Sequence, residues 1–215
     1  MSLTLQYHPL SSYCWKVLIA LYENATPFTP QLVDLGDAAQ RAALLKLWPI
    51  GKFPVLQDDA RGAIVPESSI VIDYLDRHYP GRTRFIPEGD LGLQTRLRDR
   101  FYDLHLHDHM QKIVGDRLRP RDQVDRFGVA AAKVKLRTAL DLIERDMAAG
   151  PWAMGEVFTL ADCAALPALV YGNKVLPFTD THRNVADYLE RLLARPSVGR
   201  VMKEAEPYAH LFPQE

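Results

Sequence analysis

The 215-residue sequence contains only two cysteines, Cys14 and Cys163, which lie far apart in the chain. Two distant thiols do not make the disulfide framework of a small secreted domain, and they fit the reducing cytoplasm better. No apolar run reaches the length of about 18 residues that a membrane span needs. The N-terminus also lacks a basic stretch followed by an apolar one, so we expect no secretory signal. With a net charge of -1, the chain shows no general attraction to nucleic acid or to a membrane surface, and we expect a cytoplasmic protein.

The first 80 residues alternate between strand-like and helix-like patterns. The apolar residues between Cys14 and Leu21 recur at the i, i+3, i+4 and i+7 spacing of one helix face. Pro30 falls inside a strand-like run, which indicates a strand at the edge of a sheet. A further helix is expected to start near Glu67 and to stop before Pro80. The other expected elements are strands at 3–7, 28–35, 53–58 and 63–66 and a helix at 38–48.

After residue 81 the pattern changes to helices only. Residues 81–90 are rich in glycine, proline and charge and read as a linker. Helices are expected at 91–117, 122–148, 159–172 and 183–194, with a last short one after Pro196. The sequence therefore predicts an α/β domain over 1–80 and an all-helical domain over 91–215.

Four separated segments carry a resemblance to a known family. They are SSYCWKVLIAL (11–21), PIGKFPVL (49–56), PESSIVIDYL (66–75) and FTLADCAALPAL (158–169). In their order and spacing they resemble a cytosolic glutathione S-transferase over nearly the whole chain. The resemblance implies a thioredoxin-like domain that binds glutathione and a helical domain that forms the pocket for a second, electrophilic substrate. It also implies a homodimer with a role in detoxification and no metal.

The second segment places Pro54 at the start of a strand, where it removes a backbone donor. In the family this proline is cis, which leaves the backbone of the residue before it, here Phe53, free to pair with a thiol peptide. An ordinary trans loop proline is the alternative, because cis is the minority state of X–Pro bonds. The resemblance also implies that Lys52 contributes to glutathione binding.

The third segment places Glu67 and Ser68 where a strand gives way to a helix. The N-terminus of a helix favours a carboxylate ligand, which Ser68 could also bind, while Glu67 could pair with an ammonium group. The γ-glutamyl end of glutathione carries both groups on one carbon. The residues alone favour a helix cap with an acidic first turn over a ligand site, and the resemblance reverses this preference in favour of the glutathione site.

The first segment offers Ser11, Ser12 and Cys14 as reactive groups. In serine-type members of the family, the catalytic hydroxyl stands at the position of Ser11, where it would favour the thiolate of glutathione. Ser12 is the reserve candidate, with the N-cap of the following helix as its alternative role. Cys14 lies on the apolar helix face, where burial would raise its pKa and make it a poor nucleophile.

Within the family this first segment is closest to the zeta group, whose members isomerise maleylacetoacetate as well as transferring glutathione. Tyr13 and Leu18 depart from that group's pattern. The sequence therefore favours a glutathione transferase. The alternatives are a zeta-type isomerase, a non-catalytic binding or scaffold protein, and a disulfide reductase that would need a reactive Cys14.

The stretch HLHDH (105–109) suggests a metal site, because His105 and His109 are four residues apart. No further ligand motif accompanies them, and we expect no metal. With Tyr13 and Tyr102, they are instead candidates for the wall of the second-substrate pocket. The spacing of Thr159 and Asp162 resembles a capping box, which we interpret as structural, and Cys163 beside them as a core thiol.

Overall fold

The computed structural model describes residues 2–214, which form two compact units. The first unit contains the chain up to Phe85 together with Pro196–Tyr208, and the second contains Ile86–Arg195 with the residues from Ala209 onward. The expected fold class, an α/β part followed by a helical part, is confirmed.

The first unit is built on a four-stranded sheet in the order β2-β1-β3-β4. Strand β1 pairs in parallel with β2 and antiparallel with β3, which pairs antiparallel with β4. Pro30 lies in the edge strand β2, as predicted. The elements in chain order are β1 (Leu3–Tyr7), α1 (Ser12–Glu23), β2 (Thr29–Leu32), α2 (Ala38–Leu47), β3 (Val55–Asp58), β4 (Ala63–Pro66) and α3 (Ser68–His78).

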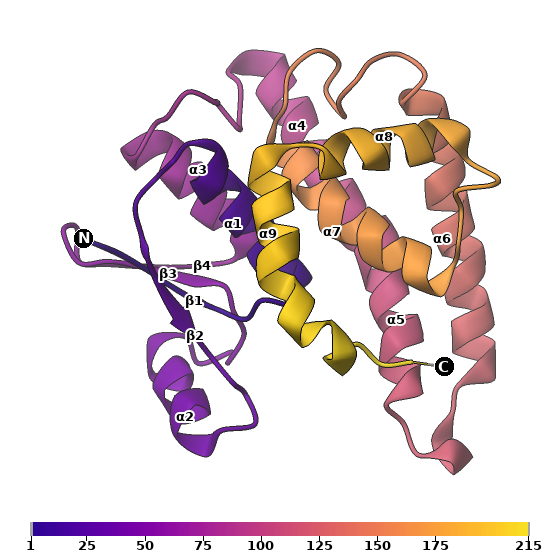
Figure 1. Cartoon of the computed structure of the whole chain (residues 1–215), viewed down its shortest axis with the longest axis horizontal. Helices are drawn as coiled ribbons and strands as arrows, with labels where there is room; N and C mark the ends of the chain where they lie inside the picture. Colours follow the sequence, from indigo (N-terminus) through magenta and orange to yellow (C-terminus); the bar gives the residue numbers. More distant parts are fainter. Residues whose placement is uncertain (1, 215) are drawn as a thin grey trace. The chain divides into compact units, whose positions relative to one another are not determined.

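Helices cover both faces of this sheet. Helix α1 packs against α3, which contacts β3 and β4, while α2 lies on the opposite side (Figure 1). Every side chain of α1 from Cys14 to Leu21 is buried, so this helix forms the centre of the unit. Under α2, the apolar core consists of Val33, Leu44 and Val55.

The last helix, α9 (Pro196–Ala205), belongs to the first unit, although it lies at the far end of the sequence. It packs along α1, where Tyr22 donates a hydrogen bond to Glu204 at 2.6 Å and Ser197 donates one to Glu23 at 2.7 Å (Figure 1). The guanidinium of Arg200 lies 3.9 Å from the centre of the Tyr22 ring. The compact units therefore differ from the division at 1–80 and 91–215, because a segment distant in sequence completes the first one.

The second unit is helical, and the helix expected at 91–117 is interrupted. Its middle, Tyr102–His107, is a π-helix, a wider turn than the α-helix on each side. The first of these helices starts inside the expected linker. The elements are α4 (Gly89–Phe101), the π-helix, α5 (Asp108–Arg117), a 3₁₀ turn (Arg121–Gln123), α6 (Arg126–Asp146), α7 (Leu160–Val175) and α8 (Arg183–Leu193); a second 3₁₀ segment, Glu206–Leu211, follows α9.

The capping box predicted at Thr159 and Asp162 is confirmed at the start of α7. The Asp162 carboxylate accepts the backbone N–H of Thr159 and that of Ala153, both at 2.8 Å, and the Tyr188 hydroxyl at 2.6 Å. Burial nevertheless raises the pKa of Asp162, against these hydrogen bonds. Cys163 is fully buried beside it, as expected. This part of the fourth segment is structural.

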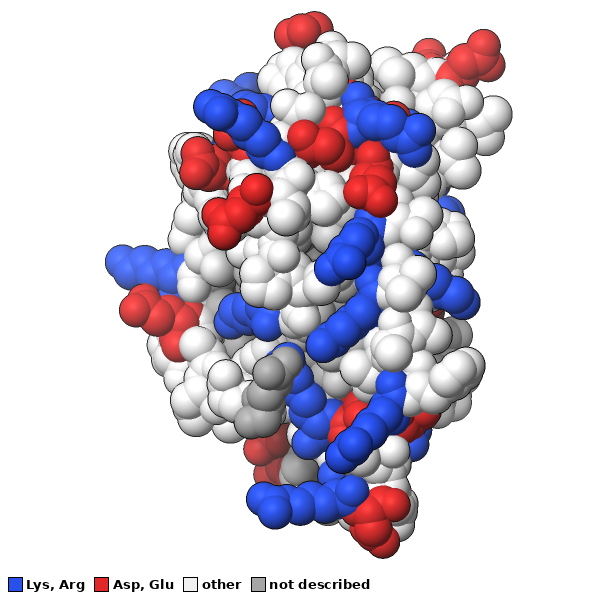
Figure 2. Space-filling model, turned by 90° about the vertical axis from the view of Figure 1, so that its right-hand side faces the viewer, with Lys and Arg blue, Asp and Glu red and all other residues white. Residues whose placement is uncertain are grey.

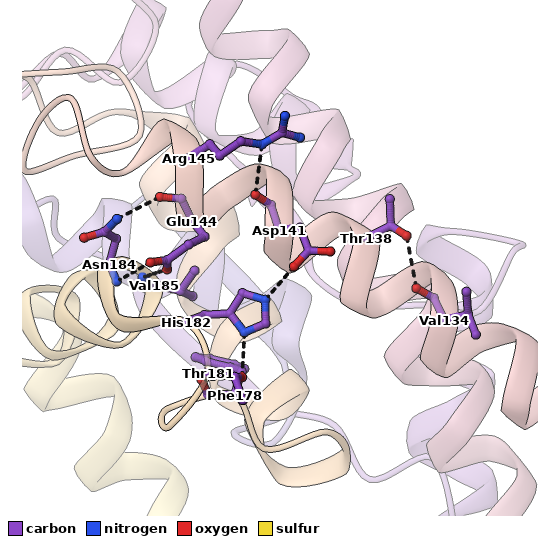
Figure 3. Close-up of polar contacts among 10 residues, drawn as sticks. All are labelled: Val134, Thr138, Asp141, Glu144, Arg145, Phe178, Thr181, His182, Asn184 and Val185. Carbon is purple, nitrogen blue, oxygen red and sulfur yellow. Dashed lines mark hydrogen bonds and ion pairs between the residues drawn. The ribbon is translucent and has the colours of Figure 1, made fainter.

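Helix α8 is attached to α6 by polar contacts at its N-terminus (Figure 3). The Glu144 carboxylate accepts the backbone N–H groups of Asn184 at 3.1 Å and Val185 at 3.0 Å. His182, which is buried, lies 3.0 Å from Asp141 through Nε2. Since α8 has no side-chain cap of its own, Glu144 of α6 takes that role.

Charges of both signs cover the face shown in Figure 2, with Lys and Arg prevailing in its middle and lower parts. At the junction of α5 and α6, Arg119 pairs with Asp116 and Lys112 pairs with Asp125. Among the described residues, no helix combines the length and the apolar character that crossing a bilayer requires.

Candidate active site

Ser11 lies at the N-terminus of α1, where it is the N-cap residue. Its backbone is extended, and its hydroxyl accepts the backbone N–H of Cys14 at 3.3 Å. The alternative role proposed for Ser12 therefore belongs to Ser11, because the helix starts directly after it. Ser12 is the first helical residue and is buried. A capping hydroxyl uses an oxygen lone pair and keeps its proton. The Ser11 hydroxyl also hydrogen-bonds the Cys14 thiol, so donation to a ligand would replace that contact.

Cys14 is fully buried in the first unit, as expected from its place on the apolar face. Burial raises the pKa of its thiol to about 12, although hydrogen bonds from Ser11 and from the His8 backbone act in the other direction. A thiol of this kind stays protonated at neutral pH and is a poor nucleophile. The geometry therefore does not favour the disulfide reductase.

The bond between Phe53 and Pro54 is cis, which confirms the prediction. Pro54 is buried directly before β3, and Phe53 is partly buried against the core under α2. The ring of His8, from the turn between β1 and α1, stacks on the Phe53 ring at 6.1 Å. The segments around Ser11 and Pro54 therefore meet at His8. Lys52 beside them is exposed.

Glu67 precedes α3 and adopts a left-handed backbone, with φ of 71°. Its side chain makes no capping hydrogen bond, so it does not act as the helix cap that the residues alone would also have allowed. A non-glycine residue with such a φ is strained, and strain of this kind is found mainly where a site requires it. The side chain of Glu67 is exposed, whereas Ser68, the first residue of α3, is buried. This placement is consistent with the predicted anion site at the helix N-terminus.

Sequence reasoning missed a buried lysine close to this helix end. Lys16 of α1 is 1% exposed and donates a hydrogen bond from Nζ to Ser69 of α3 at 3.1 Å. Its Nζ also lies 5.8 Å from the centre of the Tyr13 ring. Lysine is almost never fully buried without partners. The signal for its burial was its place among the apolar residues at 14–21. The Lys16 side chain links α1 to the start of α3.

The residues predicted for the second-substrate pocket are spread over both units. Tyr13 is partly buried in the first unit. In the second, Tyr102 lies in the core, where burial raises its pKa, His105 is exposed, and burial lowers the pKa of the partly buried His109. The pocket assignment stays a prediction, and Tyr102 is its weakest member. Among residues 2–214, no three His, Cys, Asp or Glu side chains gather in a manner that could hold a metal ion.

Comparisons with known proteins agree with the fold. Residues 5–83 match the family model described as Glutathione S-transferase, N-terminal domain, and residues 124–191 match that of the C-terminal domain. The chain is 41% identical over 76 residues to Glutathione S-transferase hmp2 of Hypomyces subiculosus, a match that covers 35% of each of the two chains. It is 26% identical over 203 residues to the chloroplastic Glutathione S-transferase DHAR3 of Arabidopsis thaliana, which covers 90% of this chain and 69% of the relative.

Among solved structures, a glutathione S-transferase from Methylobacillus flagellatus KT with glutathione bound has the same fold. Its TM-score is 0.86 at 24% identity, covering 93% of this chain and 98% of the other. The fold thus comprises a thioredoxin-like unit with a cis-proline turn and a helical unit. The chain belongs to the glutathione S-transferase family.

Proposed function

We propose that the protein is a glutathione transferase. It binds glutathione on its first unit, stabilises the thiolate of glutathione with Ser11, and conjugates that sulfur to an electrophilic small molecule. The backbone of Phe53 pairs with the bound tripeptide, Lys52 contributes to its binding, and Glu67 with Ser68 holds its γ-glutamyl end.

The position of Ser11 at the N-terminus of α1 is the observation that carries this proposal. There the hydroxyl proton and the positive end of the helix dipole act on the same ligand atom. The thiol of glutathione, with a pKa near that of free cysteine at about 8.5, is mostly protonated at pH 7. Lowering that pKa by about two units requires roughly 2.7 kcal/mol, which one charge-assisted hydrogen bond and a helix end can supply.

The experiment compares Ser11→Ala with Ser12→Ala in a turnover assay and follows the pKa of bound glutathione through thiolate absorbance. Ser11→Ala should lower kcat/KM by about 10- to 100-fold and raise the thiol pKa, because the donor to the sulfur is lost. Ser12→Ala is the control at the neighbouring position and should retain most of the activity. Full activity in Ser11→Ala would refute the assignment.

Two alternatives use the same binding residues. A zeta-type isomerase would use glutathione as a cofactor for maleylacetoacetate, and an assay with that substrate distinguishes it from a transferase. A binding or scaffold protein would hold glutathione without turnover or would not hold it at all. Retention on a glutathione-affinity column, followed by an electrophile panel, separates these cases.

We further propose a cytoplasmic homodimer, on the resemblance to the family. In support, apolar side chains are exposed at Ile64 and Ile70 of the first unit and at Leu93 and Leu97 of the second. Exposed apolar groups of this kind are common in subunit interfaces. Sedimentation equilibrium that gave only the monomer mass of 24.4 kDa would refute the dimer.

A further inference from the structure

The turn between β1 and α1 contains a histidine whose hydrogen bonds define its tautomer. The backbone N–H of Leu10 donates to Nδ1 of His8 at 3.2 Å. A ring nitrogen that accepts a hydrogen bond carries no proton, so the proton of the neutral imidazole lies on Nε2. Burial lowers the pKa of His8 and supports the neutral form, against the charge of Asp34.

Two aromatic rings fix the orientation of this imidazole. Phe53 stacks on it with an angle of 19° between the ring planes, and Tyr208, which follows α9, meets it edge-on with ring centres 5.3 Å apart. His8 is only partly buried, and among the described residues nothing accepts a hydrogen bond from Nε2. The N–H of Nε2 is thus an oriented donor with no partner among residues 2–214.

His8 contacts two segments of the proposed glutathione site. The carbonyl oxygen of His8 accepts the backbone N–H of Ser11 at 3.0 Å, and its ring contacts the residue that precedes the cis proline. A neutral N–H donor close to a bound thiolate is suited to an oxygen on which negative charge develops during the reaction. The two aromatic rings beside it favour an apolar electrophile.

We propose that His8 is a catalytic residue that donates a hydrogen bond from Nε2 to the carbonyl oxygen of a conjugated carbonyl substrate. The inference rests on the proposed transferase function and adds a catalytic residue to it. The thiolate sulfur forms a bond to the β-carbon, the electron pair of the C=C bond shifts toward the carbonyl, and an enolate results. Nε2–H stabilises the enolate oxygen and keeps its proton, and the α-carbon then takes a proton from water. Nothing leaves, so the product is the thioether adduct.

The test uses two substitutions that separate the two ring nitrogens of His8. His8→Asn keeps an acceptor near the position of Nδ1 for the Leu10 N–H but lacks the distal donor. His8→Gln keeps a donor near the position of Nε2 and loses the near acceptor. Both remove the ring and its contacts with Phe53 and Tyr208, so the two variants are matched in that respect. The exposed His78 of α3 supplies the control, as His78→Asn.

The substrates are benzylideneacetone, a conjugated ketone, and benzyl chloride, which has no oxygen to accept a hydrogen bond. His8→Asn should lower kcat/KM for the ketone by roughly 10- to 100-fold more than for the chloride, and His8→Gln should recover much of that loss. His78→Asn should match the parent protein with both substrates. The KM for glutathione should stay the same in all four proteins.

Other results would overturn the inference in distinct ways. Equal losses with both substrates, or a raised KM for glutathione, would place His8 in glutathione binding or in the turn. A larger loss in His8→Gln than in His8→Asn would show that only the Nδ1 contact matters. Turnover of benzyl chloride without any of the ketone would leave the transferase function in place and refute the role of His8. An absence of turnover with every electrophile would refute the proposed function itself.

Discussion

Cys14 and Ser11 lie three residues apart and have opposite chemistry. The thiol is the more nucleophilic group in free amino acids, yet burial raises its pKa to about 12. The hydroxyl of Ser11 does not ionise at neutral pH, but it stands at a helix N-terminus, where the helix dipole favours an anion. At the scale of single residues, burial and position therefore determine the chemistry that each group can offer, and residue type alone does not.

The burial of Cys14 predicts that the native protein resists thiol modification. Iodoacetamide at neutral pH should label neither Cys14 nor Cys163, since both are fully buried, whereas the denatured chain should take two labels. Mass spectrometry of the native and denatured protein counts the labels. Cys14→Ala should keep the glutathione transfer rate. Fast labelling of Cys14 in the native state, or a loss of transfer in Cys14→Ala, would instead establish a reactive thiol.

At the scale of elements, the N-terminus of α8 is capped by a side chain from another helix, and removing that side chain should lower the stability of the protein measurably. Glu144→Ala removes the acceptor of the Asn184 and Val185 backbone N–H groups, which then lose their partner in the first turn of α8. The expected loss is about 1–3 kcal/mol of unfolding free energy, measured by urea denaturation. Glu144→Gln keeps one carbonyl oxygen and should lose less.

The control for this cap is Glu190→Ala, on the exposed side of α8. It should change the stability by no more than about 0.5 kcal/mol. Equal effects of Glu144→Ala and Glu190→Ala would show that the contact from α6 contributes nothing beyond helix propensity.

Local signals predicted some elements well and others poorly. The capping box at Thr159 and Asp162 was readable because both partners lie within one turn. The cap from Glu144 was not, because its partners are 40 and 41 residues away and only the packing of α6 on α8 brings them together. The π-helix at Tyr102–His107 was missed for a related reason. An apolar spacing near 3.6 residues does not distinguish a single wide turn inside a long helix.

The candidate site divides in the same way. Ser11, Pro54, Glu67 and Ser68 were found through segments that resemble a family. The orientation of His8 was not, because it depends on Phe53 and on Tyr208, 200 residues further along the chain. The left-handed backbone of Glu67 also had no signal in the sequence, since the residue there is not glycine.

At the scale of the whole molecule, the first unit is completed by a segment from the end of the chain. Helix α9 buries Val198, Val201 and Ala205, and it packs along α1, which forms the centre of that unit. Sequence patterns located a helix after Pro196 but could not tell which part of the protein it would join. An amphipathic helix needs an apolar surface, and its periodicity does not say whose surface that is.

The packing of α9 leads to a prediction about truncation. A chain that ends at Arg195 should lose its stable first unit and its retention on glutathione resin, although residues 1–85 are intact. The buried valines contribute about 1.5–3 kcal/mol each, which is a large share of the 5–15 kcal/mol that typically separates a folded domain from its unfolded state. Thermal unfolding followed by circular dichroism, together with binding to the resin, measures both effects.

Point variants on α9 distinguish packing from the mere loss of chain. Val201→Ala should cost about 2 kcal/mol, because two buried methyl groups are removed from a site that is 1% exposed. Lys203→Ala, on the exposed side of the same helix, should leave the melting temperature nearly unchanged. If the truncated chain melted like the full one and still bound glutathione, the first unit would not need α9 for its stability. If Val201→Ala and Lys203→Ala behaved alike, its packing on α1 would not contribute to the stability of the first unit.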